Sequence, residues 1–265
     1  MNQHVAVAPP AAADPAAPRP DGPQEAEGLH AASDGAGRLL DGVGGGVAAV
    51  VERVARWRGS KPMHPKGALL RARLDRAGGA ASGVAWIDEP GHDDVAVRFS
   101  RGGGLPDGWP DVHGLALRTP DGADLLLSTS GRAIGLRHGL ALQRVVGRGS
   151  YTSIMPFRTE RGPVMLAALP DPERDLPTDP AALADELGAR PWRLTLVWAP
   201  FLGAWRAFGS LEVSGRARDE IDPPVRFEPL APPVGLAVYP WVARVREPAY
   251  LAARRGFPTP TSPQP

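Results

Sequence analysis

The chain has 265 residues, a formal net charge of +1, 43% hydrophobic residues and no cysteine. The small net charge argues against nucleic acid as an obligatory partner, and the lack of cysteine excludes disulfides, zinc–thiolate sites and thiol nucleophiles. No segment approaches the ~20 apolar residues of a membrane-spanning helix and no signal peptide is evident, so we expect a cytoplasmic protein.

The two ends of the chain differ in composition from the middle. Residues 1–35 are rich in Ala, Pro, Gly and Asp, and residues 256–265 are rich in Pro and Thr. Neither end has enough bulky apolar side chains to offset the entropy lost on ordering. The sequence therefore predicts two disordered tails around one domain at 36–255, which is long enough to bury a sizeable core.

The first periodic segment follows the N-terminal tail. Apolar residues recur there at helical spacing, with basic side chains on the other side: Val47, Val50, Val51, Val54 and Trp57. A basic amphipathic helix is compatible with a membrane surface. The shortness of the apolar stripe favours a helix that packs on its own domain.

A series of short apolar segments bounded by Gly, Pro or Asp then predicts strands. They occupy residues 69–74, 83–88, 95–100, 112–118, 124–129, 151–157, 163–169, 192–198 and 207–213. A Pro-Asp-Gly sequence at 120–122 predicts a turn, and one helix begins at Pro180 and ends at Gly188. Many strands with few helices predict an α+β fold, an antiparallel closed β-barrel with attached helices.

Several motifs follow one another along the same region. They are His64-Pro-Lys-Gly-Ala, Val97-Arg-Phe-Ser100, Pro110-Asp-Val-His-Gly-Leu-Ala-Leu117, Asp124-Leu, Phe227-Glu-Pro-Leu-Ala-Pro-Pro-Val-Gly235-Leu and Arg246-x-x-x-Tyr250. In this order they resemble the motifs of haem catalases, specifically of small catalase-like proteins, over residues 60–255. The resemblance implies a barrel that binds haem b.

The segment 241–255 has the pattern of a helix on which Arg246 and Tyr250, four residues apart, share one face. A neighbouring guanidinium favours the phenolate form of tyrosine, and ferric iron favours it more strongly. Tyrosinate is the proximal haem ligand of catalase. The resemblance therefore implies Tyr250 as the iron ligand and Arg246 as the stabiliser of its phenolate. A helix that starts at Pro248 would alter the shared face.

The resemblance also assigns the opposite, distal side of the haem. It implies His64 as the acid and base, Ser100 as the residue that orients the His64 ring, and Arg98 and Lys61 as propionate-binding residues. A histidine titrates near ~6.5, so at neutral pH it can take a proton from one peroxide oxygen and return it to the other. A surface histidine beside a proline is the alternative interpretation of His64.

Other pairings compete with these assignments. An internal carboxylate such as Asp93 or Asp124 would also satisfy a buried Arg98. His92 and His113 are the competing haem ligands. His92 follows a Pro-Gly sequence and has the character of a turn residue, whereas His113 replaces an arginine of the family and is expected to pack in the barrel.

Two departures from the catalase pattern concern the distal side. Catalases have Gly-Asn-Asn where this chain has Leu127-Ser128-Thr129, and the second asparagine helps to bind peroxide. Thr129 keeps a hydroxyl donor with a different reach, and Lys61 lacks the bidentate geometry of the arginine it replaces. These differences affect the expected turnover of hydrogen peroxide more than the expected binding of haem.

The sequence thus predicts a catalase-like haem peroxidase that reduces hydrogen peroxide or organic peroxides with an unidentified electron donor. The chain lacks the wrapping arm and the C-terminal helical segment of full-size catalases, so we expect a monomer or a small homo-oligomer. Two alternatives remain open: a barrel that binds haem or another apolar ligand without turnover, and an isomerase that rearranges fatty hydroperoxides.

Overall fold

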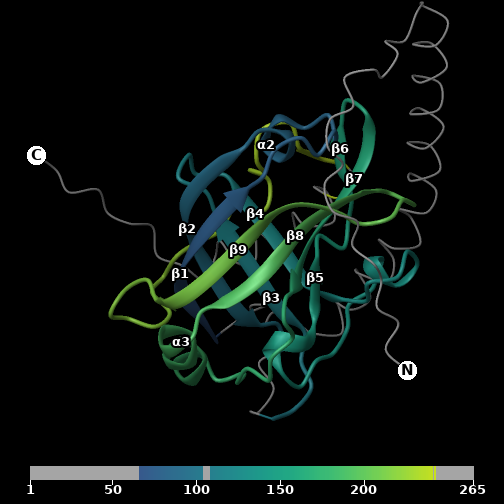
Figure 1. Ribbon diagram of the computed structural model, residues 1–265. Helices are drawn as coiled ribbons and strands as arrows, with labels where there is room; N and C mark the ends of the chain where they lie inside the picture. The colour runs from purple at the N-terminus through teal and green to yellow at the C-terminus, as the bar shows by residue number, and fades with distance from the viewer. Residues whose placement is uncertain (1–65, 104–107, 241, 243–265) are drawn as a thin grey trace, which may run out of the picture.

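Strands account for most of the regular structure in the computed structural model, which describes residues 66–103, 108–240 and 242 (Figure 1). The elements are β1 (Lys66–Arg76), α2 (Ala85–Asp88), β2 (Gly91–Arg101), β3 (His113–Arg118), β4 (Asp124–Ser130), η1 (Leu136–His138), η2 (Val146–Arg148), β5 (Ser150–Thr152), β6 (Phe157–Thr159), β7 (Gly162–Pro170), α3 (Pro180–Ala189), β8 (Trp192–Pro200), β9 (Arg206–Arg216) and β10 (Ala237–Val238). None of the described helices has the length and apolar character needed to cross a membrane.

Eight strands close into an antiparallel barrel. Their order is β7-β5-β4-β3-β2-β1-β9-β8, and β8 pairs again with β7 to complete the circle. β6 and β10 extend the sheet beside β7. Closure leaves no unpaired edge among these eight strands, and it confirms the barrel predicted from the sequence.

Alternation along each strand separates the barrel interior from its outer surface. On β1, Ala68, Leu70, Ala72 and Leu74 face the core. The largest side chains of the interior come from several strands and include Phe99, Tyr151, Trp192 and Phe208. Phe99 and Trp192 each meet the Tyr151 ring edge-on, with centroids 6.2 and 6.1 Å away. Because side chains fill the barrel interior, we expect ligand-binding surfaces on the outside of the barrel.

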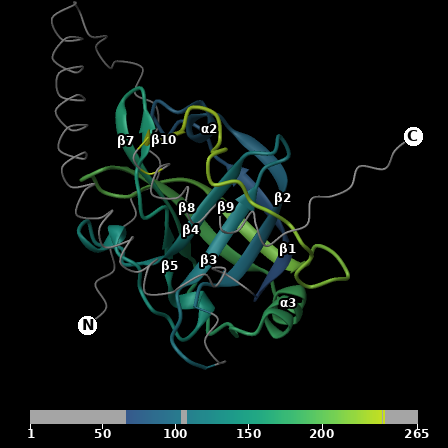
Figure 2. The same cartoon turned by 180° about the vertical axis from the view of Figure 1, so that it is seen from behind.

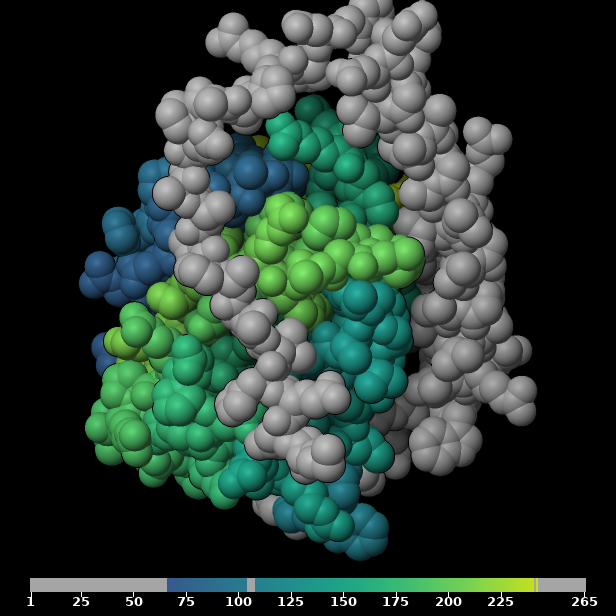
Figure 3. All heavy atoms as spheres, turned by 45° about the vertical axis from the view of Figure 1, so that its right-hand side comes forward, coloured from purple at the N-terminus to yellow at the C-terminus, as the bar shows by residue number. Residues whose placement is uncertain are grey.

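A second apolar layer lies on the outer face of β7 and β8. It consists of Met165, Ala167, Leu169, Val197, Ala199 and Trp205. The segment 131–142 packs beside this layer and against the turn between β8 and β9. In Figure 3 the segment is teal and the turn is light green, and the two lie next to each other. The indole of Trp205 donates to the carbonyl of Arg132 at 2.9 Å. These contacts fix the position of η1.

The segment after β9 runs along the outside of the barrel toward α2 (Figure 2). It is anchored at one end by Leu69, whose N–H donates to the carbonyl of Ile221 at 2.7 Å. Farther on, the N–H of Asp124 donates to the carbonyl of Ala231 at 2.7 Å. The segment therefore borders the outer surface of β1 to β4.

Most predicted elements are confirmed, with bounds that differ by up to four residues, and two predictions are wrong. The strand predicted at 83–88 is instead α2, preceded by a tight turn. The Asp88 carboxylate accepts the backbone N–H groups of Ser82 and Gly83 at 2.8 and 2.7 Å, and Gly83 has φ +82°. This local carboxylate–amide network competes with sheet pairing.

The strand predicted at 151–157 is divided into β5 and β6, because Ile154 has φ 59° and breaks the extended backbone. The predicted helix that starts at Pro180 is confirmed as α3. Its N-cap is Asp179, whose carboxylate accepts the N–H of Ala182 at 2.9 Å. The predicted tails and the predicted helices at 47–57 and 241–255 lie outside the described residues, except for Val242.

Candidate functional site

Arg98 and Ser100 lie on the same outer side of β2. They are two residues apart, and neighbouring side chains on a strand point to opposite faces. Val97 and Phe99, which alternate with them, belong to the barrel core. Arg98, which the resemblance assigns to a haem propionate, and Ser100, which it assigns to orienting His64, therefore share one face.

The strand register continues this face across β3 and β4. Ser100 is opposite Gly114, which in turn is opposite Ser128. Arg98 is opposite Ala116. We call Arg98, Ser100, Gly114, Ala116 and Ser128 the small-residue face, because every member except Arg98 has a short side chain or none. Leu69, opposite Arg98, and Leu126, opposite Ala116, border it on the same side of the sheet. Such a surface allows the close approach of a flat ligand.

Arg98 is held by a carboxylate from the segment after β9. Its Nε and Nη2 donate to the two oxygens of Asp222 at 2.8 and 2.9 Å, and both side chains are largely buried, with 16% and 23% exposed. Gly67 leaves space for this pair, since an added Cβ would lie 2.8 Å from the guanidinium carbon. Asp93 and Asp124, the alternatives considered from the sequence, pair with other arginines.

Thr129 lies on the other face of the sheet from Ser100. Its neighbours in the alternation, Leu125 and Leu127, face the core. The Thr129 hydroxyl donates to the carbonyl of Ala141 at 2.7 Å and accepts the N–H of His113 at 3.0 Å. The structure therefore brings Ser128, rather than Thr129, onto the face that carries Ser100.

His113 lies inside the barrel end, next to a buried ion pair. Its side chain is 0% exposed, and its ring centroid is 5.4 Å from that of Phe99. Burial lowers the pKa of His113 to about 4, so the ring is neutral at neutral pH. Arg101 and Asp111 form the ion pair, with Nε and Oδ2 3.7 Å apart. His113 is thus on the opposite side of β3 from the small-residue face, as its expected packing in the barrel required.

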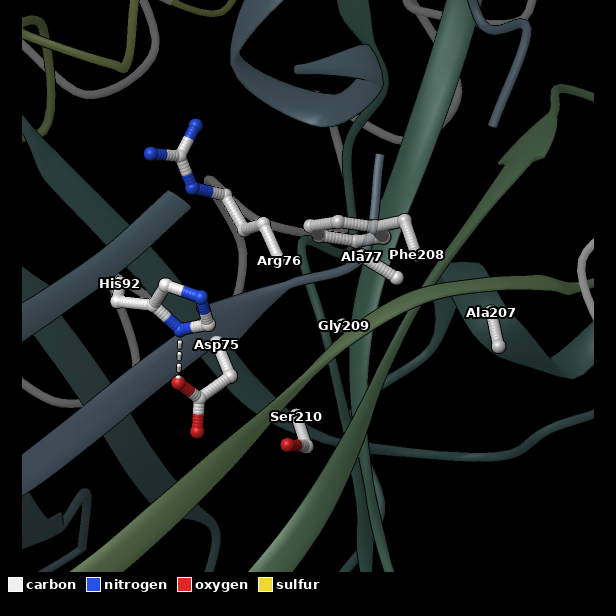
Figure 4. A pocket seen from close by; sticks show the side chains of 8 residues that line it. All are labelled: Asp75, Arg76, Ala77, His92, Ala207, Phe208, Gly209 and Ser210. Atoms are coloured by element: carbon white, nitrogen blue, oxygen red, sulfur yellow. Dashed lines mark hydrogen bonds and ion pairs between the residues drawn. The ribbon is translucent and has the colours of Figure 1, made fainter. Parts of the chain in front are cut away.

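The other candidate ligand, His92, borders an open pocket of about 300 Å³ (Figure 4). Its Nδ1 lies 2.6 Å from Oδ1 of Asp75, and this hydrogen bond lowers the pKa of the Asp75 carboxyl. The remaining lining residues are Arg76, Ala77, Ala207, Phe208, Gly209 and Ser210. The β1–β2 ladder pairs Asp75 with His92 and Gly67 with Ser100, so roughly 26 Å of strand separates the pocket from the small-residue face.

Four predicted site residues lie outside the described residues: Lys61, His64, Arg246 and Tyr250. In the sequence, His64 precedes the start of β1 by two residues, and Arg246 follows Val242 by four. Their roles stay predictions. Within residues 66–103, 108–240 and 242, no group of three or more His, Asp or Glu side chains is placed to hold a metal ion.

Two members of this site were not predicted from the sequence. Ser128 shares its strand parity with Leu126, so the apolar run 125–127 does not show in the sequence which side of β4 faces the core. Asp222 offers no local signal either, since 124 positions separate it from Arg98.

Comparisons with known proteins support the fold. No family model matches the sequence, and no curated protein matches it. The structure is similar to a solved structure described as a bacterial catalase, with a TM-score of 0.51 and 13% sequence identity. The match covers 78% of this chain and 59% of that chain, so the chain spans less than two thirds of the catalase's length. At this identity the similarity concerns the fold alone.

Proposed function

We propose that this protein is a catalase-like haem peroxidase that reduces hydrogen peroxide or organic peroxides with electrons from an external donor. One observation carries the proposal. Arg98 and Ser100, from the motif that resembles the catalase sequence, lie together on the small-residue face of a barrel whose fold is similar to that of a catalase.

The small side chains of the small-residue face support the proposal of haem b as a flat ligand. Gly114, Ala116 and Ser128 present little side-chain bulk to a flat macrocycle. The Arg98 guanidinium supplies a cation for a propionate through a charge-assisted hydrogen bond. Asp222 already occupies two of its N–H groups, so a propionate would share Arg98 with Asp222 or displace it.

The residues outside the described ranges complete the proposal. Tyr250 would hold the iron as a phenolate, and Arg246 would favour that ionised form. Lys61 would supply a second cation for the propionates. The bound haem would supply the redox chemistry at iron.

The catalytic contribution of the protein itself is proton transfer. His64 would take a proton from the near oxygen of the peroxide and return it to the leaving oxygen. Ser100 would accept the other ring N–H of His64 and so fix the orientation of the ring. Because peroxide cleavage consumes electrons, the complete cycle needs a reducing substrate that binds elsewhere or approaches the haem edge.

Haem binding without turnover is a second candidate, and the position of Thr129 favours it. Its hydroxyl proton is used by Ala141, on the other side of the sheet from Ser100. The distal side would then offer the Ser128 hydroxyl, and not that of Thr129, in place of the asparagine with which catalases help to bind peroxide. An apolar ligand inside the barrel is disfavoured, because large side chains fill the interior.

The test is an absorbance spectrum of protein purified from haem-replete cells. We expect a ferric tyrosinate haem spectrum that Tyr250→Phe loses and that the matched control Tyr239→Phe keeps. Parent protein that takes up no haem, even on titration, would overturn the proposal. Stopped-flow mixing with hydrogen peroxide and an organic peroxide then separates turnover from binding alone, and analysis of the products of a lipid hydroperoxide detects isomerisation.

A further inference from the structure

The pocket of His92 lies across β1, β2 and β9, and it is hollow because several lining residues have little or no side chain (Figure 4). Ala77, Ala207 and Gly209 contribute at most a methyl group each. Glycine is required at 209 by the close approach of β9 to β1, since an added Cβ would lie 2.4 Å from the Asp75 carbonyl oxygen. The pocket measures about 300 Å³, whereas an apolar cavity of roughly 150 Å³ holds benzene. It therefore has room for one substituted ring.

The apolar part of the pocket is held in place by its surroundings. The Phe208 ring meets Trp86 edge-on, with centroids 5.7 Å apart. The N–H of Ala77 donates to the carbonyl of Phe208 at 2.9 Å. The Arg76 guanidinium beside them donates to Asp93 at 3.0 Å and to the Trp86 carbonyl at 2.9 Å. A ligand thus meets side chains that need little ordering when it binds.

The polar part of the pocket is a row of three side chains. The strand register places Ser210 opposite Asp75, and Asp75 opposite His92. Nδ1 of His92 is turned toward Oδ1 of Asp75, 2.6 Å away (Figure 4). A carboxylate only accepts, so Nδ1 carries the proton and Nε2 of the neutral ring is an acceptor. The His92 side chain is 70% exposed, which leaves a ligand free to approach it.

Three polar atoms of this row are unused within the part of the chain that the structure describes. They are Nε2 of His92, Oδ2 of Asp75 and the hydroxyl of Ser210, since the hydrogen bonds of His92 and Asp75 involve Nδ1 and Oδ1 alone. Two of the three only accept. A ligand that satisfies them must therefore donate a hydrogen bond.

The charges around the pocket are already balanced. Asp75 pairs with Arg73, whose Nε lies 3.2 Å from Oδ1, and Arg76 pairs with Asp93. An anionic ligand would lie against the Asp75 carboxylate, and a cationic one would find that carboxylate compensated. Among the described residues, too few His, Asp and Glu side chains gather here to hold a metal ion. These features select a neutral ligand.

We propose that the pocket of His92 binds a phenol, whose hydroxyl donates to Nε2 of His92 and whose ring lies against Ala77, Ala207 and Phe208. The unused acceptors select the hydroxyl donor. The apolar lining selects the ring, and aromatic pairs add favourable edge-on or offset packing with Phe208. The site is separate from the small-residue face, and the proposal does not rest on the proposed peroxidase activity.

Titration of para-cresol into isotope-labelled full-length protein, followed by the amide signals in two-dimensional NMR, tests the proposal. We expect saturable shifts centred on Ala77, Phe208 and Gly209. His92→Phe keeps a flat ring but removes the acceptor, so it should weaken binding roughly two- to tenfold. The control Asp94→Ala removes an exposed polar side chain from the same face of β2, two positions farther along, and should keep the parental affinity.

The space in the pocket is tested by filling it. Ala207→Leu should abolish the saturable shifts, because the longer side chain occupies the volume of the ring. Ala133→Leu, at an exposed position outside the pocket, is the matched control and should bind para-cresol as the parent does. If Ala207→Leu fails to fold, Ser210→Leu takes its place, since it fills the same pocket from the outer face of β9.

Three analogues test the chemistry of the ligand. The methyl ether of para-cresol lacks the donor, cyclohexanol lacks the aromatic ring, and benzylamine replaces the hydroxyl with a cation. Each should bind more weakly than para-cresol, and an analogue that binds as tightly would overturn the assignment of a phenol. Parental affinity in His92→Phe, shifts centred outside the pocket, or no saturation in the parent would overturn the site itself.

Discussion

The Arg98 guanidinium is positioned before any ligand arrives. Asp222 accepts from it in a bidentate manner, and Gly67 provides the space beside it. A cation held in this way is preorganised for a second anion, because its rotamer is already fixed. The arrangement has a cost for ligand binding, since any propionate competes with an internal carboxylate. The strength of the pair therefore bears on both stability and function.

Removal of Asp222 should be more destabilising than removal of an exposed carboxylate. In Asp222→Ala the largely buried Arg98 loses its partner, and we expect a loss of about 1–3 kcal/mol in the free energy of unfolding. In the control Asp175→Ala the partner Arg148 is more than half exposed, so the loss should be clearly smaller than in Asp222→Ala. Urea denaturation measures both, and equal losses would show that Asp222 does not stabilise the fold through Arg98.

His113 should make the barrel sensitive to acid. Burial holds its folded pKa at about 4, below the usual value of 6.5, so the unfolded chain binds more protons between these two pH values. The stabilisation is complete above about pH 6.5 and is lost as the pH falls toward 4, at a cost that reaches about 3 kcal/mol. His138, whose pKa burial also lowers, adds a loss of the same sign.

Urea denaturation at pH 7 and pH 4.5 measures the contribution of His113. We expect His113→Leu to reduce the difference in unfolding free energy between the two pH values. The control His92→Leu, at an exposed position, should leave the loss between pH 7 and pH 4.5 close to that of the parent. An unchanged difference in His113→Leu would mean that the acid sensitivity arises elsewhere.

At the scale of one element, β4 shows how alternation divides structural from functional side chains. Thr129 links β4 to the Ala141 carbonyl and to the His113 N–H inside the barrel end. Ser128, one residue earlier, lies on the small-residue face opposite Gly114. Two consecutive side chains of β4 therefore have different environments: Thr129 makes hydrogen bonds inside the barrel end, and Ser128 lies on the outer face.

This division predicts opposite consequences for two similar substitutions. Thr129→Val keeps the shape of the side chain but leaves the His113 N–H and the Ala141 carbonyl without their partner, so we expect a loss of about 1–3 kcal/mol in unfolding free energy. Ser128→Val should change it by less than about 0.5 kcal/mol, because valine suits a strand. If both variants melt at the same temperature, the assignment of the two faces of β4 is wrong.

The same element shows what the sequence could and could not predict. β4 was recoverable because a short apolar run, Leu125 to Leu127, is bounded by polar residues, and such a run is a local property. The turn at Asp88 was missed because its carboxylate bonds to two preceding N–H groups, which an apolar pattern does not reveal. Asp222 could not be found at all, since nothing near Arg98 in the sequence indicates a partner from beyond β9.

At the scale of the whole molecule, the filled barrel acts as a scaffold with distinct outer surfaces. The small-residue face lies on β2 to β4, and Arg137 lies beside the β8–β9 turn. The pocket of His92 lies at the far end of β1 and β2 (Figure 4). A closed barrel has no free edge, so loops and segments outside it can vary without loss of strand pairing. Function at these surfaces is therefore separable from the stability of the barrel.

All eight strands of the closed barrel come from residues 66–216, which predicts how the protein responds to truncation. Deletion of residues 1–35 should leave the melting temperature unchanged, because the composition of that segment gives it little apolar surface to bury. Deletion of residues 1–58 should lower it by several degrees. It also removes the apolar stripe that ends at Trp57, and burial of even two or three such side chains contributes a few kcal/mol. Differential scanning calorimetry of the two truncated proteins and the parent makes the comparison.

A several-degree loss in the shorter deletion would show that residues 1–35 pack on the domain. Equal melting temperatures in all three would show that the amphipathic segment does not pack on it, and a membrane surface would then become the better partner for that segment.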